Sequence, residues 1–467
     1  MRLTSQAIKI IAIISLLFLT LLSIGCSRTE QATSIPQNSR TKLLIDNVNI
    51  IDVENERIIP NRQILVKDGT ISAIRAAGSL DNSHASIVKD AKGGFIAPGL
   101  IDMHVHAYDK SAFELSLSHG VTHVRVMNGV KQHLQWRSEQ QAGKWLASGM
   151  TVSSPIIHSG DSQPLSWTAN SEQEARSLVR QAKRQGYDLI KAYGSLSKES
   201  LLAIIDESKK LSLPVAKHGP HPAPGMHWQD LAGLQSLEHV EDIYQGPLAY
   251  NHDEKKLKPV LANLQQVGTS VTPTLNIFWQ LSQISKNKQA FLDDLPQDYI
   301  SPIIAWEAKS NQVDRWLNSS EKMSKHNQKT FDFLSEITFA LEDKNIPILM
   351  GSDAGVLLSP HGLATHNELR LLKQSGLSAF SVLRSATILP AKALGKEHEI
   401  GQVKVGLKAD LILTRHNPLQ ALNVLKKPIA VVRQGQWLAE DDLNRLRDHA
   451  IKQQSWWSEL KVILTNY

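Results

Sequence analysis

The sequence contains a single cysteine, Cys26, among 467 residues. Without a second cysteine the chain forms no intramolecular disulfide, and no cluster of thiolates can bind a metal ion. Its hydrophobic fraction of 42% and charged fraction of 21% are those of an ordinary globular protein. The 51 basic and 45 acidic residues are scattered rather than clustered. This charge pattern predicts a solvated mixed surface and no nucleic-acid partner.

The N-terminal apolar run is shorter than a membrane-spanning helix. It reads IIAIISLLFLTLLSIG, follows Arg2 and Lys9, and ends at Gly25, whereas a spanning helix needs about 20 apolar residues. A positively charged start followed by a short apolar centre predicts a signal peptide over residues 1–25.

Cys26 directly follows this run, in LSIGC, which resembles the lipobox of bacterial lipoproteins. We therefore expect Cys26 to carry a lipid anchor, residues 26–40 to form a polar tether, and the protein to face the periplasm of a bacterial cell envelope. Ser27, rather than aspartate, follows Cys26, and this favours an anchor in the outer membrane. An ordinary cleaved signal with an incidental cysteine, or an uncleaved anchor, is the alternative.

Short strands and turns fill residues 41–98. Alternating apolar residues in KLLIDNVNIIDV and RQILVKDGTISAIRA predict strands, and Asp68-Gly69 predicts a hairpin turn. Strand character returns over 400–437, in GQVKVGLKADLIL and IAVVRQGQWL. We expect these two segments to form one small β-sandwich domain, because an exposed sheet edge needs covering.

Residues 99–399 alternate strand candidates, such as VTHVRVM, DLIKAYG and IPILMGSDA, with amphipathic helical stretches. This rhythm predicts an α/β fold, a parallel (β/α)8 TIM barrel. A polar stretch from Gln280 to Lys329 is either a lid over the C-terminal mouth of the barrel or a plain surface excursion. Residues 438–467 predict a C-terminal amphipathic helix.

Lys191 interrupts an otherwise apolar strand in YDLIKAYGS. A charged amine in a protein core is costly unless it is paired or chemically altered. The unmodified alternative is a lysine at a strand end that reaches water or pairs with a carboxylate.

Histidine and aspartate side chains follow several of the predicted strands. His104 and His106, in GLIDMHVH, point to one strand face and can reach one metal ion. His218, His239 and Asp353 stand at the ends of later strand candidates. These side chains converge only if the strands close into a barrel, so they predict a metal centre at its mouth.

The motifs GFIAPGLIDMHVH, DLIKAYGSLS, PVAKHGPH, AGLQSLEHV, MGSDAG and SATILPAKALG occur in this order along the chain. In this respect the sequence resembles the amidohydrolase superfamily over residues 41–437. Lys191 places it nearest the prolidase- and imidazolonepropionase-like branch. The resemblance implies a metal-dependent (β/α)8 barrel with a β-sandwich built from both ends of the chain.

The resemblance also implies a binuclear centre with two divalent metal ions, expected to be Zn²⁺. The more buried ion would be bound by His104, His106 and Asp353, the more exposed ion by His218 and His239, and the bridge would be Lys191 carboxylated by carbon dioxide. Burial would lower the pKa of the amine and make it nucleophilic. A hydroxide bridging the ions would attack the substrate, and Asp353 would act as the catalytic base.

This chemistry predicts a hydrolase that cleaves a C–N amide bond in a small peptide-like or N-acyl substrate. His221 follows the ligand candidate His218, Tyr193 shares the strand face of Lys191, and His158 ends a strand candidate. We expect these three side chains, His221, Tyr193 and His158, to contact substrate. The sequence is compatible with an oligomer.

Two other interpretations stay open. One is a mononuclear amidohydrolase or deaminase, acting on a cyclic amide or amidine, that uses His104, His106, His239 and Asp353 with Lys191 unmodified. The other is an envelope binding protein that keeps the barrel without catalysis. The number of bound metal ions per chain separates the first from the binuclear enzyme.

Overall fold

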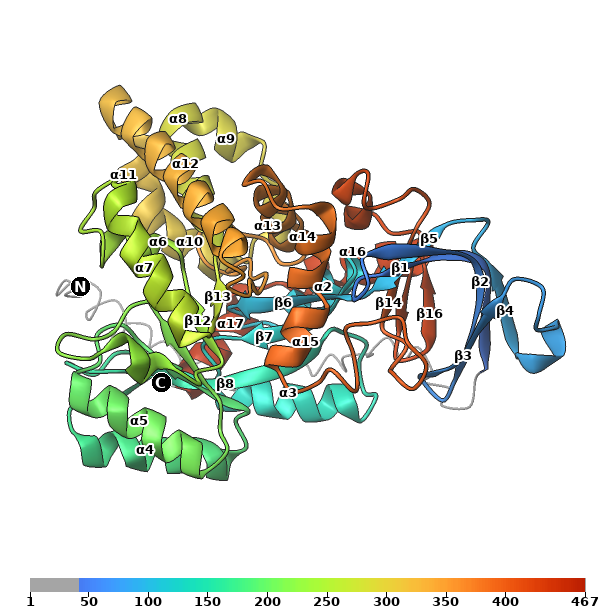
Figure 1. The fold of residues 1–467 in the computed structure, drawn as a ribbon, viewed down its shortest axis with the longest axis horizontal. Helices are drawn as coiled ribbons and strands as arrows, with labels where there is room; N and C mark the ends of the chain where they lie inside the picture. Colours follow the sequence, from blue (N-terminus) through green and yellow to red (C-terminus); the bar gives the residue numbers. More distant parts are fainter. Residues whose placement is uncertain (1–41, 467) are drawn as a thin grey trace, which may run out of the picture. The chain divides into compact units, whose positions relative to one another are not determined.

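The computed structural model describes residues 42–466, so the predicted signal peptide, Cys26 and the tether lie outside the described residues. Figure 1 shows a helix-surrounded set of parallel strands and a separate sheet built from both ends of the described chain. This arrangement confirms the predicted fold class. Within residues 42–466, no helix combines the length and the apolar character needed to cross a membrane.

Seven parallel strands form most of the barrel, in the order β13-β12-β11-β10-β8-β7-β6. They are β6 (Leu100–Val105), β7 (Val121–Val126), β8 (Gly149–His158), β10 (Leu189–Ala192), β11 (Val215–His218), β12 (Ser236–Glu238) and β13 (Ser270–Thr272). The short β9 (Ser166–Thr168) pairs with β8. Parallel strands of this kind present their carboxyl ends on one face, where barrel enzymes place their active sites.

Residues 347–354 close the barrel between β13 and β6. Val271 bridges to Ile348 and Val105 bridges to Ala354, both in parallel orientation. Gly351 is required at this seam, because a Cβ atom there would lie 2.9 Å from His104 Cβ and 2.5 Å from Thr272 Cγ2. The MGSDAG motif therefore supplies the eighth, irregular strand of the barrel.

Helices connect and cover these strands. Those within the barrel region are α2 (Ser111–Ser118), α3 (Lys131–Gln141), α4 (Glu172–Gln185), α5 (Lys198–Lys210), α6 (Glu241–Gln245), α7 (Glu254–Val267), α8 (Leu275–Asn287), α12 (Glu321–Asp343), α13 (Leu363–Gln374), α14 (Ala379–Ser385) and α15 (Ile388–Ala393). Serine side chains cap several of them, as Ser171 does for α4 by accepting from the backbone N–H of Glu174.

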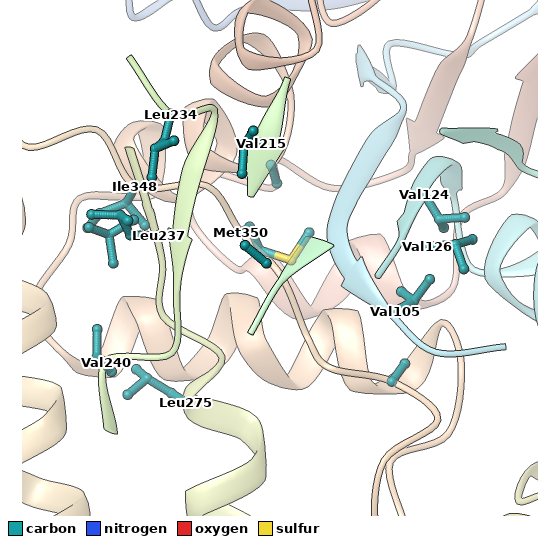
Figure 2. Close-up of a cluster of buried hydrophobic side chains, with 14 of the residues drawn as sticks. Val105, Val124, Val126, Val215, Leu234, Leu237, Val240, Leu275, Ile348 and Met350 are labelled. Atoms are coloured by element: carbon teal, nitrogen blue, oxygen red, sulfur yellow. The ribbon is translucent and has the colours of Figure 1, made fainter. Parts of the chain in front are cut away.

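The barrel core consists of branched aliphatic side chains from neighbouring strands. Figure 2 shows Val105, Val124 and Val126 gathered on one side, with Leu237 and Ile348 on another. Each of these side chains is at most 2% exposed. Burying one such side chain contributes roughly 1.5–3 kcal/mol, so the strands that carry the polar site residues are held by this core.

The second sheet joins the two ends of the described chain, in the order β16-β15-β14-β5-β1-β2-β3 with β4 beside β1. Its strands are β1 (Leu43–Asp52), β2 (Arg57–Lys67), β3 (Thr70–Ala76), β4 (Ile87–Asp90), β5 (Phe95–Pro98), β14 (Leu411–Thr414), β15 (Ala430–Arg433) and β16 (Gln436–Ala439). The predicted hairpin turn lies between β2 and β3, where Asp68 and Gly69 both have positive φ. The antiparallel pairing of β5 with β14 connects the early and late segments.

The C-terminal segment forms two helices, α16 (Glu440–Gln453) and α17 (Trp456–Thr465), instead of the single helix predicted over 438–467. The break lies at Gln454 and Ser455, both of which have extended backbone. The Ser455 hydroxyl accepts a hydrogen bond from the backbone N–H of Ser458 and so begins a new helix.

Helix α17 packs against the segment inserted between α8 and α12. This insertion contains α9 (Gln289–Asp293), α10 (Pro302–Ala308) and α11 (Asp314–Leu317). Glu459 of α17, 3% exposed, accepts hydrogen bonds from the backbone N–H of Ile303 and the hydroxyl of Ser301 at the start of α10. Burial nevertheless raises the pKa of Glu459 to about 7.

Replacing Glu459 by glutamine should stabilise the protein increasingly as pH rises. The pKa of the Glu459 carboxyl is raised above the ordinary 4.5 in the folded protein. As pH rises, this carboxyl therefore loses its proton in the unfolded chain first, and its contribution to the stability of the wild type falls between about pH 4.5 and pH 7. The neutral glutamine avoids that loss and keeps an acceptor for Ile303. Relative to wild type, we expect no gain from E459Q near pH 4 and up to about 3 kcal/mol at pH 8.

Urea unfolding at pH 4 and pH 8 measures this difference. Glu440→Gln, at an exposed helix start, is the control and should show a small, pH-insensitive change. A pH-independent effect of Glu459→Gln would contradict the buried, proton-binding carboxyl.

Candidate metal centre

Side chains from three distant parts of the chain form a buried group of His104, His239 and Asp353. One nitrogen or oxygen of each lies within 4.8 Å of the others. His239 and Asp353 have positive φ angles of 70° and 53°, which cost a residue with a side chain about 1–3 kcal/mol. The surrounding structure imposes this backbone strain, and strained residues of this kind cluster at functional sites.

His106 and His218 extend this group. Asp353 Oδ1 lies 3.2 Å from His106 Nε2 and 3.5 Å from His104 Nε2. The ring centroid of His239 lies 4.4 Å from that of His218 and 4.7 Å from that of His104. The structure thus brings the four predicted histidines and Asp353 together at one end of the barrel strands.

Lys191 lies in the interior beside these histidines. Its side chain is 1% exposed, and its Nζ has no hydrogen-bond partner within the described part of the chain. Burial lowers the pKa of His104, His218 and His239 well below the usual value, and the charge of Lys191 lowers each further. Burial also lowers the pKa of Lys191 to about 8, so a substantial share of this amine is neutral at neutral to mildly alkaline pH.

Glu238 fixes the proton of His104. The Nδ1 of His104 donates to Glu238 Oε2 at 2.7 Å, which leaves Nε2 with a free lone pair facing Asp353. Although burial alone would raise the pKa of Glu238, Arg125 and Lys191 lower it below its usual value. Glu238 is therefore an anion, and an anionic acceptor of this kind orients a metal-binding imidazole and raises its basicity.

Thr274 fixes the proton of His239 in the same way. The Thr274 hydroxyl donates to the carbonyl of Pro273 at 2.7 Å, so its oxygen accepts from His239 Nδ1 at 2.8 Å. The Nε2 lone pair of His239 is thereby left free.

Arg125 neutralises Glu238 inside the barrel. Its Nη2 donates to Glu238 Oε1 at 2.8 Å, its Nη1 to the Ser236 hydroxyl at 2.7 Å, and its Nε to the Met103 carbonyl at 2.6 Å. Both partners of this ion pair are fully buried. No role for Arg125 or Glu238 is predicted from the sequence. Each is a charged residue within an apolar strand, which is the pattern that draws attention to Lys191.

Asp102 is a further residue that the sequence reasoning missed. It accepts from the hydroxyls of Ser352 and Thr365, each at 2.6 Å, and from the backbone N–H groups of Ser352 and His104. These bonds tie β6 to the closing segment that carries Asp353.

The three predicted substrate contacts occupy different surroundings. Tyr193 stacks on His218 with ring centroids 4.3 Å apart. His221 packs near Gly219, and burial lowers its pKa to about 4. The ring nitrogens of His158 lie 3.0 Å from the Ser166 hydroxyl and 3.2 Å from the Ser159 carbonyl. Substrate contact by these three side chains stays a prediction.

A cavity beside His106 is lined by the loop after β6, the inserted segment and α17. It has about 350 Å³ of empty space, partly open to solvent, and its lining includes Tyr108, Tyr299, Ile304 and Glu459. Part of the insertion therefore borders the mouth of the barrel, as the lid interpretation expects.

The donor set fits a divalent metal ion. The buried histidines are neutral, as metal ligands must be, and two of them have a free Nε2 defined by a bond at Nδ1. Asp353 Oδ1 is buried without a hydrogen-bond partner in the described chain. An unpartnered buried carboxylate oxygen is costly unless it binds a cation.

Comparison with known proteins finds similarity to amidohydrolases and related enzymes. The sequence profile of the amidohydrolase family matches residues 303–438. An imidazolonepropionase from Geobacillus sp. is 23% identical over 387 residues, which is 76% of this chain and 84% of that protein. A 64-residue segment is 44% identical to an adenine deaminase from Chelativorans sp., and it spans only 10% of the length of that deaminase.

Solved structures of two hydrolases share the fold. A bottromycin amidohydrolase superposes with a TM-score of 0.73 at 21% identity, covering 88% of this chain and 90% of that one. A Xaa-Pro dipeptidase with methionine bound in its active site superposes with a TM-score of 0.64 at 20% identity, covering 85% and 100%. Prolidase-like and imidazolonepropionase-like proteins are thus among the neighbours of this chain.

Replacing Glu238 by glutamine should weaken metal binding and destabilise the barrel. A glutamine amide can donate to His104 Nδ1 and so move the proton to Nε2, where the lone pair is needed. We expect zinc affinity, measured by competition with a chelator, to fall about 10–100-fold. The free energy of unfolding should fall by about 3–5 kcal/mol, because Arg125 is left buried without its partner.

Glu172→Gln provides the control, because Glu172 pairs with Arg176 on an exposed helix surface. It should cost less than about 1 kcal/mol and leave zinc binding unchanged. Unchanged zinc affinity in Glu238→Gln would show that Glu238 does not control the proton of His104.

Proposed function

We propose that this chain is a metal-dependent hydrolase that cleaves a C–N amide bond in small peptide-like or N-acyl substrates. The observation that carries the proposal is the buried, unpartnered amine of Lys191 among neutral histidines and Asp353. The family match and the prolidase-like and amidohydrolase neighbours support a hydrolase acting on C–N bonds.

In this proposal His104, His106 and Asp353 would hold one divalent ion, His218 and His239 would hold a second, and Lys191 as a carbamate would supply a ligand to both. Two such ions, when bound, lower the pKa of a shared water and polarise a substrate carbonyl. Zn²⁺ suits this mixture of imidazole and carboxylate donors.

Lys191 supplies the bridging anion. Its neutral Nζ attacks the carbon of carbon dioxide, an N–C bond forms, and one proton leaves to solvent. A pKa of about 8 leaves about a tenth of the amine in the reactive neutral form at pH 7 and about half at pH 8. The carbamate then replaces a buried cation by an anion, which suits the neighbouring metal ions.

The remaining side chains hold protons and position groups. Glu238 and Thr274 retain the Nδ1 protons of His104 and His239. Asp353 accepts the proton of the attacking water and passes it to the leaving nitrogen. Tyr193, stacked on His218, borders the space where the substrate amide would lie.

A mononuclear deaminase is the second candidate function. The short similarity to an adenine deaminase favours it, and His104, His239 and Asp353 alone could hold one ion. The count of metal ions per chain separates the two functions.

The experiment that tests the proposal combines metal analysis with a substrate panel. The full chain, loaded with zinc and bicarbonate, is incubated with Xaa-Pro dipeptides and N-acetyl amino acids, and released amine is measured. We expect hydrolysis that disappears when a chelator removes the metal. Absence of hydrolysis across both substrate groups in fully loaded protein would contradict the proposed activity.

Replacing Lys191 by alanine should reduce the bound metal from about two ions per chain to one or fewer. Elemental analysis after loading with zinc, with and without bicarbonate, measures this change. Lys217 is the matched control, because it is also buried with a pKa of about 8, but its Nζ donates to the carbonyls of His218 and Gly219. Lys217→Met should keep the bicarbonate dependence. One ion per chain, insensitive to Lys191, would establish the mononuclear alternative.

Replacing Asp353 by asparagine should lower turnover about 100-fold to 10,000-fold, because the amide cannot accept and return the proton. Initial rates on the best substrate of the panel provide the measurement, with metal content determined in parallel. Turnover near the wild-type value would remove Asp353 from the role of base.

A further inference from the structure

Asp242 lies in the first turn of α6, shortly after His239. Its Oδ2 is 3.2 Å from His218 Nε2. The same oxygen is buried and has no hydrogen-bond partner within the described residues. The close approach to His218 is therefore not explained by a well-formed hydrogen bond.

Asp353 makes the same kind of carboxylate–imidazole approach to His106. Its Oδ1 is 3.2 Å from His106 Nε2 and is likewise buried without a partner. Two donor atoms bound to one zinc ion at about 2.0–2.2 Å lie roughly 2.9–3.5 Å apart in tetrahedral or five-coordinate geometry. Both carboxylate–imidazole distances fall in this range, so each pair has the spacing of two ligands of one ion.

We propose that Asp242 Oδ2 is a ligand of the second metal ion, together with His218 and His239. This inference rests on the proposed two-metal function and adds a ligand to it. The Nε2 atom of His218 and the Oδ2 atom of Asp242 are 3.2 Å apart, so both can reach one ion.

The backbone around Asp242 leaves room for this role. Gly219, with φ of 81°, follows His218, and a Cβ atom there would lie 3.6 Å from Asp242 Oδ2 and 2.9 Å from His221 Cε1. A side chain at position 219 would displace His221, whereas its Cβ atom would make an ordinary contact with Asp242. Glycine therefore allows the loop after β11 to pass close to α6 while Asp242 faces His218.

Asp242 also changes the charge of the centre. Asp353, Asp242 and the Lys191 carbamate would offset three of the four positive charges of two divalent ions. A hard oxygen ligand at the second position favours ions that accept carboxylate donors, such as Zn²⁺ or Mn²⁺, over softer ions.

The first test measures metal binding directly. Full-length wild type, Asp242→Asn and the control Glu254→Gln, an exposed acid in the first turn of α7, are equilibrated with zinc buffers, and zinc per chain is determined. We expect wild type and Glu254→Gln to bind about two ions, and Asp242→Asn to bind the weaker ion at least about 10-fold less tightly. Wild-type affinity for both ions in Asp242→Asn would overturn the proposal and leave Asp242 as a substrate-facing residue.

A second measurement does not depend on loss of binding. In Asp242→Cys loaded with Co²⁺, a thiolate ligand at this position should produce a near-ultraviolet thiolate-to-cobalt charge-transfer band. Wild type, which retains Cys26, and Glu254→Cys, with its thiol on an exposed helix surface, should lack that band. A cobalt-loaded, folded Asp242→Cys protein without the band would overturn the proposal.

These readouts are separate from the failure of the proposed activity. Wild type that binds two ions but hydrolyses no amide in the panel would remove the activity and leave the ligand assignment intact. Wild type that binds only one ion, with affinity insensitive to Asp242, would remove both the second metal site and this ligand.

Discussion

The closure of the barrel between β6 and residues 347–354 is the constraint on which the candidate centre depends. The backbone N–H of Met103 donates to Met350 at 2.9 Å, that of Asp353 to His104 at 2.8 Å, and that of His106 to Ala354 at 2.7 Å. These bonds hold two segments that are far apart in the sequence in one register. Without them, His104 and Asp353 would not share a site, and the carboxyl ends of the other strands would have no common centre.

The interior of this barrel tolerates the charges of Arg125 and Glu238 because these two side chains neutralise each other. Arg125 and Glu238 form a buried ion pair, and Glu238 also holds the proton of His104. A buried pair of this kind adds little net stability by itself. Its contribution is orientation, because it decides which nitrogen of His104 faces Asp353. Lys191 differs from Arg125, since its amine has no hydrogen-bond partner in the described chain.

Much of this arrangement could be predicted from the sequence, because its signals are local. His104 and His106 stand two residues apart, and Lys191 breaks an apolar run. Their places in the six ordered motifs then make them ligand candidates. Asp242 gives no such signal, because an acidic residue in the first turn of a helix is ordinary. Its proximity to His218 depends on how the loops after β11 and β12 pack together.

The C-terminal region shows a second limit of local patterns. The spacing of apolar residues over 438–467 predicts one continuous helix, whereas in the structure a second helix begins after Ser455. The contact of Glu459 with the start of α10 depends on tertiary packing of the inserted segment. No sequence pattern in either segment predicts this contact.

The position of Glu459 in the wall of the cavity beside His106 has a consequence for biosynthesis. Chains fold from the N-terminus as they are made, and the strands that carry the ligand candidates precede α17. The barrel can thus form while α17 is still within the ribosome. The wall of this cavity is completed only after α17 has emerged, so the cavity takes its final shape later in synthesis than the barrel does.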